Sequence, residues 1–213
     1  GEAGSATAST VSNGAIRQIV EAGGPETFVG RVGTASITNA STGNITVAAS
    51  ATANALGSSL ASSQLGAAVL QNGEIIGVST TSFSNAGTFN AGSTARATGD
   101  TAQADAAAEG VRQTLLSIGG ANANLTNTGT FTVGATATST GASTAGSQAD
   151  ARGYQVISEP LALSVTNGGT FTVNAAATSN GDAEAFAGGM GFFANIDPTT
   201  LPPEEGGGGS EGH

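Results

Sequence analysis

Apolar and polar residues alternate strictly along several short stretches of the chain. In the stretch TNTGTFTVGATATST, residues 126–140, the apolar positions are Phe131, Val133, Ala135 and Ala137, and threonine or glycine stands between them. A period of two is typical of a β-strand with one buried face, and β-branched threonine suits the exposed face of a strand. The pattern therefore predicts a half-buried strand.

The same pattern occurs four times in one register. Each copy begins with Ser/Thr-Asn, continues through glycine, and enters a strand with phenylalanine or isoleucine first. The four copies are TNASTGNITV at 38–47, SNAGTFNAG at 84–92, TNTGTFTVG at 126–134 and TNGGTFTVN at 166–174. Their asparagines follow one another at intervals of 46, 42 and 40 residues. A regular period of this length is the signature of a repeat protein.

A repeat with one apolar face cannot bury that face alone, so successive repeats must stack. We predict an all-β fold, a parallel β-solenoid of about 40-residue repeats with a narrow, alanine-rich core. Glycines 87, 129 and 169 are expected to form the tight turn after each asparagine. Stacking places the asparagines in a corner ladder, where they tolerate a left-handed backbone and their amides bond along the stack. The corner ladder comprises Asn39, Asn85, Asn127 and Asn167, and the core ladder comprises Ile45, Phe89, Phe131, Phe171, Val47, Val133 and Val173.

A weaker half-repeat lies between these units. Its copies are GAIRQIV at 14–20, GVRQTLL at 110–116, RGYQVIS at 152–158 and GMGFFANI at 189–196. Each repeat thus has two strand-bearing halves, and the sequence leaves open whether one coil takes twenty or forty residues. We predict one solenoid domain over 1–200, with a half-repeat at 5–37, repeats at 38–83, 84–125, 126–165 and 166–197, and an acidic Pro/Gly-rich tail at 198–213.

Composition narrows the function. The 213 residues include 34 glycines, 4% aromatic residues and no tryptophan, and the net charge is −10. Such a charge disfavours nucleic acid and anionic membranes as partners. Cysteine is absent, which excludes disulfides and thiolate chemistry, and no apolar run is long enough for membrane insertion.

Catalytic chemistry has few candidates. The single histidine is the terminal His213, and lysine is absent, so the usual Ser-His-Asp, Cys-His and lysine mechanisms have no components. The carboxylate pairs Asp100/Asp105 and Asp182/Glu184 leave polysaccharide cleavage as a minor alternative. Aspartates in comparable alanine-rich tracts could present oxygens to Ca²⁺, although solvated surface acids are the simpler interpretation. We expect no enzyme activity and no cofactor; the calcium alternative would use Asp100, Asp105, Asp150 and Asp182.

The outward positions of the repeated strand are rich in threonine. A flat face of threonine ladders resembles the binding face of ice-binding solenoids, although Asn90, Arg96 and Ala176 interrupt it and threonine is common on exposed strands. The residues of this candidate binding face are Thr52, Thr94, Thr132, Thr136, Thr138, Thr172 and Thr178.

The repeat style resembles bacterial autotransporter passenger regions, haemagglutinin-like adhesins and β-strand-repeat surface proteins. The matching features are the TNxGTFTV unit, the AxAxA tracts at 102–108, 135–137 and 175–177, and the G-apolar-x-Q turns that end at Gln18 and Gln113. The resemblance implies a secreted, non-enzymatic parallel β-solenoid that acts in adhesion, biofilm matrix or surface filaments.

These observations lead to one main hypothesis and one alternative. We expect an extracellular structural subunit that joins copies of itself end to end, because residues 5–20 look like half a repeat rather than a polar cap. The alternative is a monomeric adhesin or ice-binding protein that uses its threonine face, with surface glycans as partners.

Overall fold

The computed structural model describes residues 4–12, 14–22, 32–75 and 77–194. The predicted acidic tail at 198–213, with His213, lies outside these residues. No helix long and apolar enough to cross a membrane occurs in the described part of the chain. Its regular elements are the strands β1 (Ala6–Ser12), β2 (Ile16–Ala22), β3 (Val32–Asn39), β4 (Asn44–Asn54), β5 (Ser58–Ile75), β6 (Val78–Asn85), β7 (Thr88–Asn127), β8 (Thr130–Asn167), β9 (Thr170–Ser179) and β10 (Asp182–Ala194).

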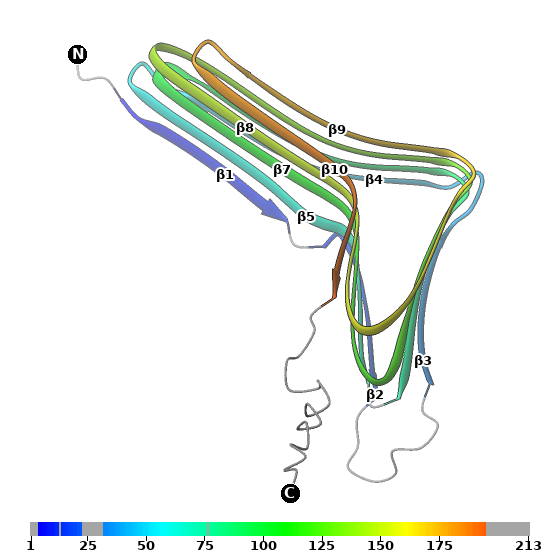
Figure 1. The fold of residues 1–213 in the computed structure, drawn as a ribbon. Coiled ribbons are helices and arrows are strands. Elements are labelled where there is room, and N and C mark those ends of the chain that lie inside the picture. The colour runs from blue at the N-terminus through cyan, green and yellow to red at the C-terminus, as the bar shows by residue number, and fades with distance from the viewer. Residues whose placement is uncertain (1–3, 13, 23–31, 76, 195–213) are drawn as a thin grey trace, which may run out of the picture.

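The long strands bend around corners, so each coil of the chain has four successive faces (Figure 1). We name these faces A, B, C and D in chain order, and each corner asparagine stands between the end of face D and the start of the next face A. Face A comprises 44–54, 88–98, 130–140 and 170–179, and face B comprises 6–12, 58–65, 101–109, 144–152 and 182–188. Face C comprises 16–22, 69–75, 111–117, 154–158 and 190–194, and face D comprises 32–39, 78–85, 121–127 and 161–167.

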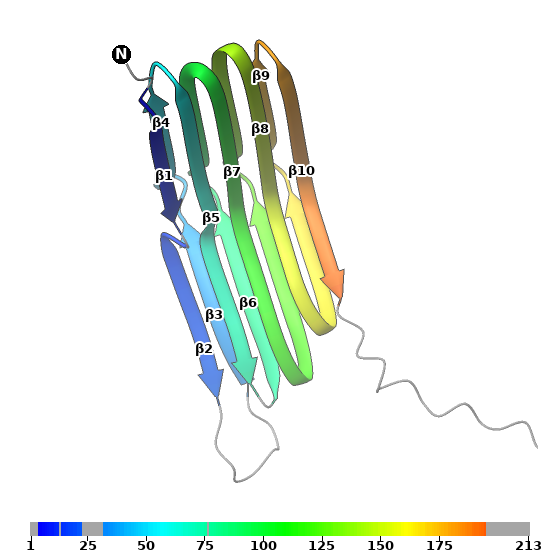
Figure 2. The same cartoon turned by 90° about the vertical axis from the view of Figure 1, so that its left-hand side faces the viewer.

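All strand pairs are parallel and join equivalent positions of successive coils. The predicted parallel β-solenoid is therefore confirmed. One coil takes forty-odd residues, as the pairing of Asn39 with Asn85 and of Asn85 with Asn127 shows, which answers the question that the sequence left open. Figure 2 shows the coils side by side, from the N-terminal layer to the C-terminal layer.

The cross-section has a flat arm and a wider triangular part (Figure 1). In the arm, faces A and B meet through small buried residues such as Ala95, Ala97, Ala102 and Ala104. Alanine fills only a short gap, so the two faces lie close together there. The larger buried side chains Phe83, Phe89, Val111, Leu115 and Leu125 lie on faces A, C and D, around the triangular part.

Candidate assembly interface

The corner asparagines form one hydrogen-bonded column. Asn39 Nδ2 donates to Asn85 Oδ1 at 2.7 Å, Asn85 Nδ2 to Asn127 Oδ1 at 2.8 Å, and Asn127 Nδ2 to Asn167 Oδ1 at 2.7 Å. Each of these three amides also donates, at 2.9 Å, to the backbone oxygen of a threonine in the next layer: Thr88, Thr130 or Thr170. Every donating amide thus points toward the C-terminal end, and the column has a direction.

The glycines after the asparagines have a different role from the one that the sequence suggested. None of the three has a positive φ; among the described glycines those with positive φ are Gly14, Gly77 and Gly120. A Cβ on Gly129 would lie 2.1 Å from the carbonyl oxygen of Gly87, and one on Gly169 would lie 2.1 Å from that of Gly129. The corner needs glycine because each layer touches the backbone of the layer below. The asparagines themselves are strand residues.

A column of aromatic rings runs beside the asparagines. The rings of Phe89 and Phe131 stack with centroids 4.5 Å apart, and those of Phe131 and Phe171 at 4.6 Å. Ile45 occupies the same position in β4 and is half-buried. The next inward column comprises Val47, Ala91, Val133 and Val173.

The sequence analysis missed Phe83, which packs edge-on against Phe89 with centroids 5.5 Å apart. It stands two residues before a corner asparagine, on face D. The same position in the other repeats is apolar in every case: Ile37, Leu125 and Val165. An apolar residue two positions before every corner asparagine would have predicted a second apolar column from the sequence.

A second amide column runs from layer to layer along face C. Gln113 Nε2 donates to Gln71 Oε1 at 2.8 Å, and Gln71 Nε2 donates to Gln18 Oε1 at 3.0 Å. The hydroxyl of Tyr154 donates to Gln113 Oε1 from the following layer. Burial raises the pKa of the Tyr154 hydroxyl well above its usual value of 10.0. The sequence pointed to Gln18 and Gln113, but it did not show that they continue through Gln71 to a tyrosine.

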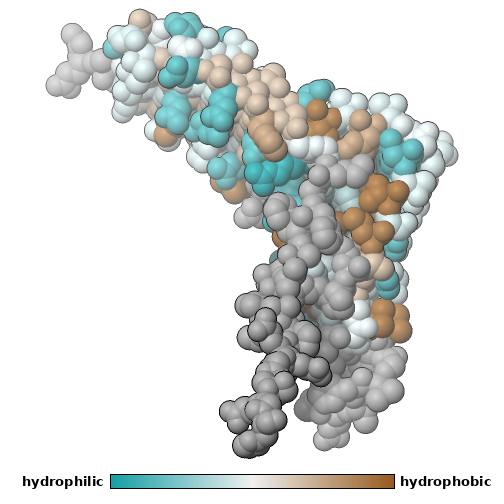
Figure 3. Space-filling model, viewed as in Figure 1, coloured by the Kyte–Doolittle hydropathy of each residue, from teal (hydrophilic) through white to brown (hydrophobic). Residues whose placement is uncertain are grey.

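Both ends of the solenoid present strand edges. In the C-terminal layer, Asn167 is exposed, and among the described residues its amide nitrogen donates no hydrogen bond. Phe171 and Val173 are only half-buried there, and in the described part of the chain face A has no further layer beyond them. Figure 3 shows this end, where apolar side chains gather over the triangular part. Exposed large apolar residues occur at both ends, Val11 (59% exposed) in β1 and Phe186 (58% exposed) in β10.

The candidate threonine-face residues all lie on the outside of face A. The pairing brings Thr132 beside Thr172, and Thr94 beside Thr136. Arg96 separates Thr52 from Thr138 in their column, and Asn90 and Ala176 interrupt the neighbouring columns. A column that the sequence analysis did not select comprises Thr88, Thr130 and Thr170.

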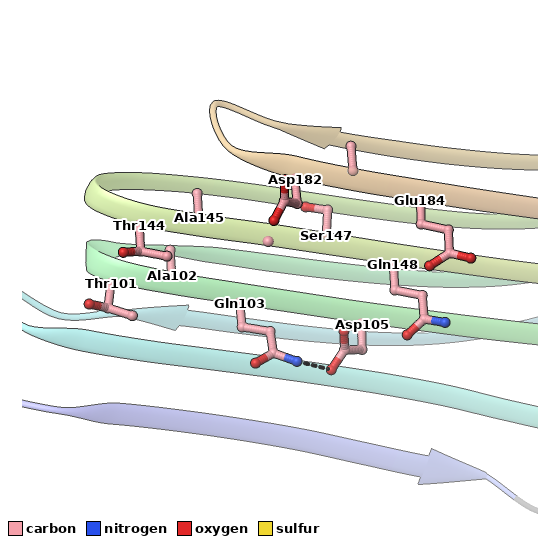
Figure 4. Close-up of a pocket in the computed structure, with 12 residues that line it drawn as sticks. Thr101, Ala102, Gln103, Asp105, Thr144, Ala145, Ser147, Gln148, Asp182 and Glu184 are labelled. Carbon is pink, nitrogen blue, oxygen red and sulfur yellow. Dashed lines mark hydrogen bonds between the residues drawn. The ribbon is translucent and has the colours of Figure 1, made fainter.

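The candidate carboxylates lie on face B, apart from Asp100, which stands between faces A and B. Asp105, Asp182 and Glu184 line an open groove of about 610 Å³ on face B, with the Gln103 amide bonded to Asp105 at 3.1 Å (Figure 4). Asp100 instead accepts a hydrogen bond from Ser143, and Asp150 pairs with Arg152 at 2.8 Å. Within the described ranges, no three acidic or histidine side chains are grouped so that they could hold a metal ion. The four aspartates of the calcium alternative therefore lie apart.

Comparison of this chain with protein-family models, curated proteins and solved structures finds no match. The functional interpretation therefore depends on the geometry of the columns and of the two ends.

Proposed function

We propose that this chain is a non-enzymatic structural subunit, which assembles head to tail into an extracellular filament or surface matrix. The observation that carries the proposal is the direction of the asparagine column. Within the described residues, the exposed Asn167 amide donates no hydrogen bond at one end, and Asn39 Oδ1 accepts none at the other. A second copy whose face D lies directly on face D of the first continues the column with the same donor and acceptor.

The strand edges support the same arrangement. All strand pairs within the chain are parallel, and a head-to-tail contact continues parallel pairing, whereas a two-fold contact between identical ends makes the strands antiparallel. A contact between two C-terminal ends also brings Asp182 and Glu184 toward their own copies, and like charges repel. Strand edges at the ends of a stack pair readily with another chain.

The extracellular location and the matrix role come from the repeat style, which resembles bacterial surface adhesins. The net charge of −10 adds repulsion between the sides of filaments, so growth along the axis is favoured over lateral clumping. Copies of the same chain are the proposed partners, and nucleic acid and membranes are not.

Face A offers the alternative function, in which a monomer binds ice or surface glycans. Its outward threonines stand in register from layer to layer, and Thr88, Thr130 and Thr170 make a column over three layers, with Asn44 in the fourth. The exposed Arg96 in the centre of the face opposes a flat binding plane, so the filament is our main proposal.

Charge placed on the C-terminal edge tests the proposal. Val173 points into the core column and Thr172 points outward on the same strand. Because an inward charge blocks edge pairing, Val173→Lys should remain monomeric by light scattering at concentrations where Thr172→Lys forms polymers. Far-UV circular dichroism checks that both variants keep their strands. Equal polymerisation of the two variants, or none by Thr172→Lys and the unmodified chain, contradicts head-to-tail assembly.

A further inference from the structure

The two ends of the solenoid both carry the same half of a coil. Faces B and C contain five layers, from β1 and β2 at one end to β10 at the other, while faces A and D contain four. When two such subunits meet with all strands in place, β10 of one lies against β1 and β2 of the next. Faces A and D then lack one layer at the junction, and the asparagine column is interrupted.

On face B, the inward residues of the two half-coils are similar in size. β10 lies against the β8 residues Ser147, Ala149 and Ala151 with Ala183, Ala185 and Ala187. At the other end, the β1 residues Ala8, Thr10 and Ser12 lie against Ala61, Ser63 and Leu65 of β5. These β5 residues stand in the same three columns as the β8 residues. Both strands thus present small side chains to one narrow slot. β5, β7 and β8 repeat one another in register on face B. The β1 strand of another copy, which matches β5 in its own subunit, therefore also matches the C-terminal edge of β8.

Residues 182–187 of β10 make fewer side-chain hydrogen bonds than β1 and β2. Residues 182–187 are all exposed, and among the described residues no side chain of this stretch makes a hydrogen bond. By contrast, Thr10 Oγ1 donates to the backbone oxygen of Ser50 at 2.8 Å, and Gln18 joins the buried amide column and donates to Ser36 O at 3.3 Å. Displacement of residues 182–187 therefore breaks their backbone pairing but no side-chain hydrogen bond of this stretch, and the incoming strand restores that pairing.

We propose that β10 is an exchangeable half-coil: in the free subunit it covers the edge of β8 at 146–158, which β1 and β2 of the next copy occupy in the filament. This inference rests on the proposed head-to-tail assembly and specifies its interface. After the exchange, β9 of one subunit pairs with β4 of the next on face A. On face D, residues 161–167 of β8 pair with β3 of the next subunit. The Asn167 amide then donates to Asn39 of the next subunit. Each subunit contributes four complete layers.

Engineered disulfides test the exchange cleanly because the chain has no cysteine of its own. Gln148 and Glu184 are register partners on β8 and β10, and neighbouring strands about 4.8 Å apart permit a disulfide. The pair Gln148→Cys with Glu184→Cys should lose polymerisation when oxidised and regain it on reduction. The matched control joins β8 to β9 through Thr138→Cys with Thr178→Cys, and it should polymerise in both states. Equal polymerisation of the oxidised β8–β10 variant and the control overturns the exchange.

Cross-links between subunits distinguish this inference from the proposed function. The exchange brings Thr178 of one copy beside Thr52 of the next. If β10 instead stays in place, Phe186 of one copy lies beside Val11 of the next. Oxidised filaments of Thr52→Cys with Thr178→Cys should give a ladder of covalent multimers, and Val11→Cys with Phe186→Cys should give none. The reverse result overturns the exchange but keeps head-to-tail assembly. Absence of filaments from the unmodified chain overturns both.

Discussion

Asn85 donates one amide proton to Oδ1 of Asn127 at 2.8 Å and the other to the backbone oxygen of Thr130 at 2.9 Å. The residues are 42 apart in the chain, yet they occupy equivalent corners of adjacent layers. Both side chains are fully buried, so each unmade hydrogen bond would leave a desolvated polar group. The asparagine column therefore fixes the vertical register of the coils.

Asn127→Ala should lower the free energy of unfolding by about 2–3 kcal/mol, because Asn85 loses its acceptor and the Thr170 carbonyl loses its donor. Urea denaturation followed by circular dichroism measures the change. Asn174→Ala, at an exposed position on β9, is the control and should change stability by no more than about 0.5 kcal/mol. Similar losses in the two variants would show that the column contributes little.

The loss of stability on removing a phenylalanine ring from the column should depend on the layer in which the ring lies. Phe131 lies between two stacked rings and is fully buried, so Phe131→Ala should cost about 3–5 kcal/mol. Phe171 has a ring on one side and is half-buried in the monomer, so Phe171→Ala should cost about 1–2 kcal/mol. Both variants are compared by urea denaturation of the monomer. An equal cost would contradict the end position of Phe171.

Gly129 at the corner before β8 and Gly134 within β8 differ in the space that an added methyl group would find. Gly129→Ala places a methyl group against the carbonyl of Gly87 and should destabilise the fold by about 2 kcal/mol or more. Gly134 has no atom within 4 Å of an added Cβ, so Gly134→Ala should be neutral or stabilise the strand by up to about 1 kcal/mol. Midpoints of chemical denaturation measure both. Tolerance of Gly129→Ala would mean that the layers are not in backbone contact at this corner.

Stability should fall at high pH because of Tyr154. Burial raises the pKa of its hydroxyl in the folded state above the unfolded value of about 10. The folded state therefore keeps a proton that the unfolded state loses, so stability is complete below about pH 10 and decreases as the pH rises further. Denaturation measured on both sides of pH 10 tests this, and no lysine or cysteine titrates in that window.

Tyr154→Phe is the control for the pH effect. It removes the hydroxyl that donates to Gln113 and should cost about 1 kcal/mol near neutral pH. The decrease in stability between pH 9 and pH 11, a window placed around the ordinary tyrosine pKa, should disappear in this variant. The same decrease in both proteins would assign it to another group.

Thr138→Arg separates the filament from the threonine-face alternative. Thr138 points outward on face A, away from both strand edges. Polymerisation should therefore be unchanged in light scattering. Loss of thermal hysteresis or of glycan binding by this variant, from a monomer that shows such activity, would support the alternative.

Face A was the most predictable part of the molecule. Its inward residues Phe131, Val133, Ala135 and Ala137 alternate with threonine or glycine, so in this stretch polarity distinguishes the inside from the outside. The period of the asparagines was enough to align equivalent layers, and strict alternation showed which residues share a column.

Faces B and C were harder to predict. On face B, the buried Ser63 accepts a hydrogen bond from Ser93 of face A, and the buried Ser147 donates one to Ser139 of face A. Polarity therefore does not mark the outer side of face B. Gln113 is a buried polar residue, and the pairing places it opposite Val156, while Tyr154 reaches it from a neighbouring column. The one-residue shift between GVRQ and RGYQ in the chain hides this contact from a comparison of the two motifs.

Electron microscopy of the purified, unmodified chain at increasing concentration tests head-to-tail assembly most directly. We predict unbranched filaments with the bent cross-section of Figure 1, layers about 4.8 Å apart and a subunit repeat of about 19 Å, the height of four layers. Single particles that stay monomeric at every concentration would contradict the account.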